Sequence, residues 1–158
     1  MSESRTSKKF TINAAFFQEI KDDHLQLREL LESLRRLVAR RPALPNHASE
    51  LVEKLSCLCD QIALHFSLEE AYGYLEDLIE VTPHLHFRTG KLREQHKMLF
   101  VMVRDLADTA ASRHKGSTAE LMQIADQFLA FDHAFKAHES AETELILSAV
   151  HQDVGVGD

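Results

Sequence analysis

The chain of 158 residues has the length of one compact domain, and its 44% hydrophobic and 27% charged residues are typical of a soluble globular protein. A formal net charge of −7 argues against nucleic acid as the main partner, because phosphates attract basic surfaces. The chain has no Trp and only five Gly and three Pro. Gly and Pro form the many turns of a β-sandwich, so their scarcity predicts an all-α fold.

Helical periodicity divides the chain into four long segments. The expected helices are residues 11–41, 46–81, 83–114 and 117–151. Residues that interrupt helices fall between them at Pro42 and Gly116, and Pro83 can occupy the first turn of the third. Residues 1–10 are polar, lack the apolar stretch of a signal peptide and are predicted to form a flexible tail. Residues 152–158 are predicted to form a second flexible tail.

Each segment repeats apolar residues every three or four positions, which is typical of a helix that buries one face. The last segment illustrates the pattern with Leu121, Ile124, Phe128, Phe131 and Phe135. Four such helices with short connections predict an antiparallel up-down four-helix bundle over residues 11–151.

Two features bear on the location of the protein. The longest apolar run, residues 98–103, is far too short to cross a membrane. Cys57 and Cys59 are the only cysteines, and at this spacing on a helix they point to different sides and cannot pair with each other. We expect both to pack as small apolar groups in a reducing, cytoplasmic setting.

Histidine is unusually frequent, with ten residues in the chain. Four of them occupy core positions, one on each predicted helix: His24, His65, His96 and His138. Counted from one end of the bundle at 1.5 Å per residue, all four lie at a height of roughly 20–24 Å, so we expect them to meet in one layer. Glu69 and Glu142 each follow one of these histidines by four residues, which places both groups on one helix face.

Burial of four imidazoles and two carboxylates costs on the order of several kcal/mol unless the groups are paired or bind a cation. A single core histidine is usually just hydrogen-bonded to a neighbour, but six polar groups at one height predict a metal site. Residue types alone permit iron, manganese or zinc. The remaining histidines are expected on the surface: His47, His84, His86, His114, His133 and His151.

The combined pattern is His24, then His65-Phe-Ser-Leu-Glu69, then His96, then His138-Glu-Ser-Ala-Glu142. Over about residues 12–150 it resembles the hemerythrin-like, or HHE cation-binding, family. This resemblance implies two non-haem iron ions bridged by the two carboxylates. One ion would take His24 and His65, and the other would take His96 and His138.

The chain departs from the oxygen-carrying members of that family at one position. They have a further histidine four residues after the histidine of the third helix, where this chain has Phe100. We therefore expect an open or water-filled position on each iron ion, with the Phe100 ring shielding one of them. Tyr72, one turn beyond Glu69, is the best substitute ligand.

The resemblance implies a protein that binds or reacts with dioxygen, nitric oxide or peroxide in sensing, scavenging or a redox stress response. The alternative is an iron store or an iron-responsive regulatory module without catalysis, and a scaffold with zinc or no metal is a third interpretation. No catalytic residue is predicted beyond the metal ligands. Neither nucleic acid nor a membrane is an expected partner, and a monomer and a homodimer are both open.

Overall fold

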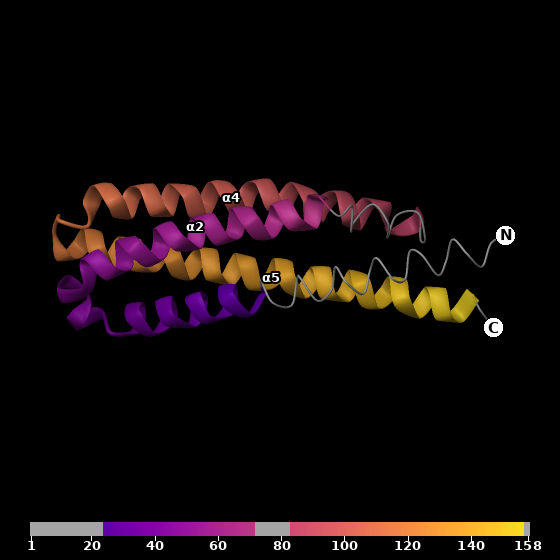
Figure 1. The fold of residues 1–158 in the computed structure, drawn as a ribbon, viewed down its shortest axis with the longest axis horizontal. Helices are drawn as coiled ribbons and strands as arrows, with labels where there is room; N and C mark the ends of the chain where they lie inside the picture. The colour runs from indigo at the N-terminus through magenta and orange to yellow at the C-terminus, as the bar shows by residue number, and fades with distance from the viewer. Residues whose placement is uncertain (1–23, 72–82, 157–158) are drawn as a thin grey trace.

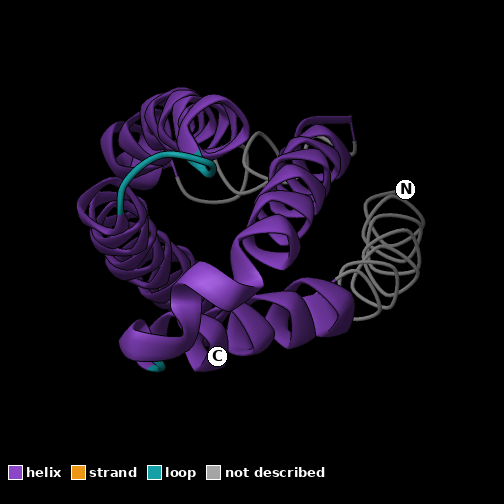
Figure 2. Cartoon of the chain, turned by 90° about the vertical axis from the view of Figure 1, so that its left-hand side faces the viewer, coloured by secondary structure: helices purple, strands orange, loops and turns teal. Residues whose placement is uncertain are grey.

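The computed structural model describes residues 24–71 and 83–156, with side chains placed from residue 24 to 70 and from 84 to 148. The predicted N-terminal tail, the predicted start of the first helix and Tyr72 lie outside the described residues. Every regular element within the described ranges is helical, and these ranges contain no strand (Figure 2). The prediction of an all-α fold is therefore confirmed.

The described residues form four α-helical segments and two short 3-10 helices. In chain order they are helical residues 24–39, η1 (Arg41–His47), α2 (Ala48–Ala71), η2 (Pro83–Leu85), α4 (His86–Arg113) and α5 (Thr118–Val156).

The ends of the helices follow from local chemistry. Pro42 and Pro45 lack an amide N–H and turn the chain through η1 in place of a continuous α-helix. The hydroxyl oxygen of Ser117 accepts a hydrogen bond from the backbone N–H of Glu120 and so caps the start of α5. The pattern of interrupting residues predicts that this helix ends at residue 151, but α5 continues to Val156. A single glycine costs a helix only about 1 kcal/mol, which is too little to end it by itself.

The four α-helical segments lie side by side along the long axis of the molecule (Figure 1). The connections at residues 40–47 and 114–117 lie at the same end, which is the left-hand end in that view. Helix α4 packs against both α2 and α5. The described residues thus form a bundle of four α-helical segments, and none of the described helices is long and apolar enough to cross a membrane.

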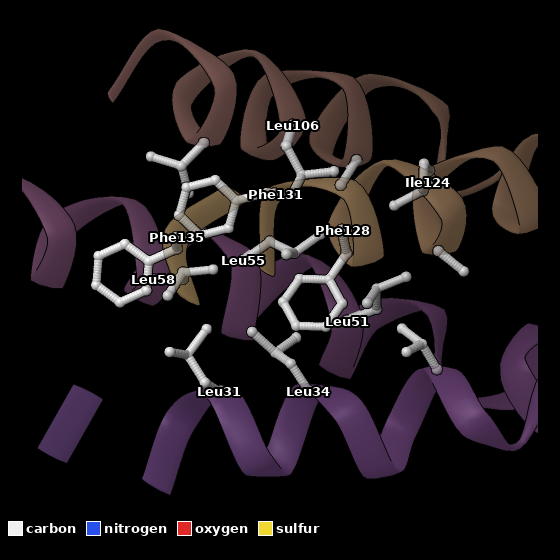
Figure 3. Packing of buried hydrophobic residues seen from close by; sticks show 14 of the residues in the cluster. Leu31, Leu34, Leu51, Leu55, Leu58, Leu106, Ile124, Phe128, Phe131 and Phe135 are labelled. Atoms are coloured by element: carbon white, nitrogen blue, oxygen red, sulfur yellow. The ribbon is translucent and has the colours of Figure 1, made fainter. Parts of the chain in front are cut away.

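One continuous apolar core fills the bundle between the helices (Figure 3). Leu31 and Leu34 of residues 24–39 point toward Phe128 of α5, while Leu55 of α2 and Leu106 of α4 close the core from the other sides. These side chains are almost completely removed from water. At roughly 25 cal/mol per Å² of buried apolar surface, such a core is the main stabilising contribution to the fold.

An ion pair within the bundle fixes the first helical segment to α5. The Arg35 guanidinium donates two hydrogen bonds to the buried Asp132 carboxylate, from Nε at 2.8 Å and from Nη2 at 2.6 Å. These hydrogen bonds raise the pKa of Arg35 above its ordinary value, even though partial burial opposes the change. A second pair, between Arg41 of η1 and Asp126 of α5, lies at the surface.

Candidate metal centre

A layer of histidines marks the end of the apolar core. In each of the four helical segments, one of these histidines lies three residues from a core side chain that is no more than 1% exposed. The four pairs are Leu27 and His24, Ile62 and His65, Leu99 and His96, and Phe135 and His138. Three residues on a helix are slightly less than one turn, so each histidine stacks next to the core on the same helix face.

The side chains of the first polar cluster are almost completely removed from water. The cluster consists of Glu69 from α2, His96 from α4, and His138 and Glu142 from α5, all of which are buried. Each offers one ligand atom, and these atoms all lie within 4.8 Å of one another. We call this set the buried group. Two imidazoles and two carboxylates suit a divalent transition metal such as iron, manganese or zinc.

A second cluster lies beside the first and closer to water. It consists of His24, the buried His65, and Glu139 from α5, whose ligand atoms are again within 4.8 Å of one another. His24 Nε2 lies 3.0 Å from Glu139 Oε1, and these two side chains are 31% and 29% exposed. We call this set the outer group.

The carboxylate of Glu69 connects the two groups. Its Oε1 lies 2.9 Å from Nε2 of His65 in the outer group, while its Oε2 lies 3.0 Å from Nε2 of His96 in the buried group. A carboxylate that offers one oxygen to each of two neighbouring histidines has the geometry of a bridging ligand. Glu142, by comparison, lies with its Oε2 at 3.4 Å from His138 Nε2 within the buried group.

Several atoms of the buried group lack hydrogen bonds although they are inaccessible to water. Among the described residues, no hydrogen bond reaches Glu69 Oε2, His96 Nε2, His138 Nε2 or Glu142 Oε1. His96 Nε2 and Glu69 Oε2 are close, but they are not aligned for a hydrogen bond. Buried polar atoms without partners cost about 1–3 kcal/mol each, and a cation between them removes that cost. The buried group is therefore suited to hold a metal ion.

The two buried carboxyl groups have opposite pKa shifts. Burial by itself raises the pKa of Glu69, but the neighbouring His65 and His96 rings outweigh it and lower the pKa well below the ordinary value. Burial raises the pKa of Glu142, the nearby Glu69 carboxylate raises it further, and His138 compensates only in part. A positive charge between Glu69 and Glu142 stabilises both carboxylates, and a metal ion supplies such a charge.

Two further side chains orient the histidines of the buried group. The amide oxygen of Gln95 lies 2.8 Å from Nδ1 of His138. Because an amide oxygen only accepts, Nδ1 carries the proton and donates it, which leaves the lone pair of Nε2 available for a metal. The Phe66 ring stacks on His96, with ring centroids 4.1 Å apart, and meets the edge of His138 at 5.8 Å.

The structure brings all six side chains that the sequence predicts as metal ligands into these two groups. Periodicity predicts a core position for His24, but its ring is half-buried at the edge of the bundle, between the first helical segment and α5. Among the histidines expected on the surface, His47, His84, His86 and His133 are exposed. His114 is half-buried, and its Nδ1 lies 3.1 Å from the carbonyl oxygen of Ala110 near the end of α4. The side chain of His151 lies outside the described part.

The cysteines agree with the prediction in part. Both are free thiols. Cys59 is half-buried and packs against the core, and this burial raises the pKa of its thiol. Cys57 is exposed, so the prediction that it packs as an apolar group is wrong. The reason is helix geometry, since residues two positions apart cannot share one face.

Three residues of the site are missed by the sequence pattern: Phe66, Gln95 and Glu139. Each is adjacent in sequence to one of the predicted histidines and lies beside the apolar stripe of its helix. A single line of residues spaced by three and four positions omits such flanking residues, although the buried face of a helix is wider than one line. Adjacency to a core histidine is the signal that would have found them.

Residues of the site line hollows at the surface of the protein. A cleft of about 640 Å³ is lined by His24, Glu69, Glu139 and Glu142, together with the basic side chains of Arg28 and Lys136. A smaller groove of about 320 Å³ between α2 and α4 is lined by Phe66, His96 and Phe100. The half-buried Phe100 ring therefore lies beside His96, and its role as a shield for an iron ion stays a prediction.

Comparisons of this chain with family models, with curated proteins and with solved structures find no match. The function of the site is therefore inferred from its own residues.

Proposed function

We propose that this protein is a non-haem diiron protein of the hemerythrin-like type, which binds or reacts with dioxygen, nitric oxide or peroxide. The observation that carries the proposal is the position of the Glu69 carboxylate, which offers one oxygen to a histidine of each group. In this assignment one ion is held by the buried group and the other by His24 and His65. The donor set also suits manganese or zinc, and iron is preferred because of the resemblance in sequence.

The proposal includes an antiparallel up-down order of the helices, for which the positions of the histidines give support. Along the chain, the histidine precedes its core neighbour in the first helical segment, follows it in α2, precedes it in α4 and follows it in α5. The chain direction therefore alternates relative to the layer from one segment to the next. This alternation is expected of an up-down bundle.

The side chains around the centre have separate roles in this proposal. Iron would supply the electrons for reaction with a small oxidant. Gln95 orients His138 by accepting a hydrogen bond from its Nδ1–H, and the Phe66 ring covers the face of His96 and packs beside His138. The cleft beside His24 gives a small ligand access to the outer group. The free thiols are compatible with a reducing, cytoplasmic setting.

An iron store or iron-responsive module is the second candidate. The exposure of His24 and Glu139 favours it, because a metal ion near water is released more easily than a buried one. In that case iron binding would be labile and unaccompanied by reaction.

Metal analysis combined with optical spectroscopy tests both candidates. The full chain is prepared anaerobically with ferrous iron, its metal content is measured, and spectra are recorded before and after exposure to air and to nitric oxide. The diiron proposal expects two iron ions per chain and a spectral change that is stoichiometric with them. Labile iron without a spectral change supports the store, and a protein that takes up zinc only or no metal refutes both.

A further inference from the structure

Glu139 is the one carboxylate of the two groups that the sequence pattern does not predict. Its Oε1 lies 3.0 Å from Nε2 of His24, and it belongs with His24 and His65 to a set of ligand atoms within 4.8 Å of one another. It follows His138 directly, so on α5 it points about 100° away from that buried histidine and toward the first helical segment. One helix thereby contributes side chains to both groups.

The two groups differ in their exposure to water. Both border the cleft of about 640 Å³. Glu69 and Glu142 of the buried group are only 4% and 7% exposed, whereas His24 and Glu139 are about one-third exposed. Metal sites enclosed by protein ligands hold their ion as a structural element, while sites that exchange ligands keep one side open to solvent.

We propose that Glu139 is a metal ligand of the position formed by His24 and His65, and that this position is the exchangeable, cleft-facing half of the centre. This inference rests on the proposed dinuclear function and extends it by assigning different tasks to the two halves. The ion of the buried group is held tightly, and the ion of the outer group is held less tightly and meets small ligands that enter through the cleft.

The charge around the outer position supports this role for Glu139. Without Glu139, the outer position would have two imidazoles and a single carboxylate, Glu69, which it shares with the ion of the buried group. A second carboxylate gives the outer position the same number of anionic ligands as the buried group has.

The test compares Glu139→Gln with the control Glu144→Gln, which removes a charge from the same cleft but belongs to neither group. Apo protein is titrated anaerobically with ferrous iron by calorimetry, and the metal content is measured after desalting. Wild-type protein is expected to bind two ions, the first more tightly than the second. Circular dichroism of the apo variants checks the fold, which a substitution at this half-exposed position should preserve.

In Glu139→Gln we expect the weaker event to lose at least about tenfold in affinity, with the tighter event changed by less than about twofold. His24→Ala should reproduce this pattern, whereas His96→Ala should remove the tighter event. Two ions bound by Glu139→Gln with wild-type affinities would overturn the inference and leave the dinuclear proposal intact. Loss of both events in a folded Glu139→Gln would also overturn it, since Glu139 would then support the whole centre. Fewer than two ions in the wild-type protein would overturn the dinuclear proposal as well.

Discussion

Substitution of Glu69 by glutamine is expected to empty both metal positions. The two carboxylate oxygens lie 2.9 Å and 3.0 Å from histidine nitrogens of different groups, so each position depends on one of them. An amide keeps one oxygen and no negative charge, and its NH₂ group does not bind a metal ion. One position therefore loses its oxygen ligand and the other loses its anionic charge. Each loss should weaken binding by at least about 100-fold, or about 2.8 kcal/mol.

The thermal stability of the protein gives a second measure of the same change. At a free metal concentration about 100 times the dissociation constant, each bound ion stabilises the native state by about 2.7 kcal/mol. Two ions together should contribute about 5 kcal/mol, which for a chain of this length raises the Tm by roughly 10–20 °C. In Glu69→Gln this difference between loaded and metal-free protein should fall below about 5 °C.

Metal content by mass spectrometry and differential scanning calorimetry with and without a chelator are the two assays. Glu53→Gln is the matched control, because Glu53 lies on the same helix α2, is exposed and belongs to neither group. It should keep both ions and the full shift in Tm. A Glu69→Gln protein that retains one tightly bound ion and half of the thermal shift would refute bridging and indicate two independent sites. An identical melting curve for loaded and metal-free wild-type protein would refute the stabilisation itself.

Three further predictions follow from the packing. Asp132→Asn breaks a buried ion pair and should lower the free energy of unfolding by about 2–4 kcal/mol. Asp126→Asn breaks an exposed ion pair and should lower it by less than about 1 kcal/mol. Urea denaturation measures both changes. Gln95→Leu should lower metal affinity about 10–100-fold with little change in the stability of the apo protein, and equal affinities in calorimetric titration would contradict its orienting role. His133→Ala and His86→Ala should leave the metal content unchanged, since both side chains are exposed, and a drop in either would show that the histidine layer is wrongly assigned.

The helical class and the polar layer within the core are predictable from the sequence alone. Apolar residues repeat at helical spacing, and this repetition is a local property that needs no knowledge of neighbouring helices. Helical rise then places His65 of α2 and His96 of α4 at the same height, because both are counted from the same end. Candidate ligands on core-facing positions are therefore predictable wherever the periodicity is regular.

Only the tertiary structure decided how these ligands are divided and which flanking residues join them. Whether Glu139 faces His24, whether Gln95 reaches His138, and which histidines Glu69 connects all depend on the rotation of each helix about its axis. A rotation of a few tens of degrees exchanges one flanking residue for another and leaves the apolar stripe equally well buried. That rotation is fixed by contacts between helices, such as the ion pair of Arg35 with Asp132, whose residues are distant in sequence. Local periodicity carries no information about such contacts.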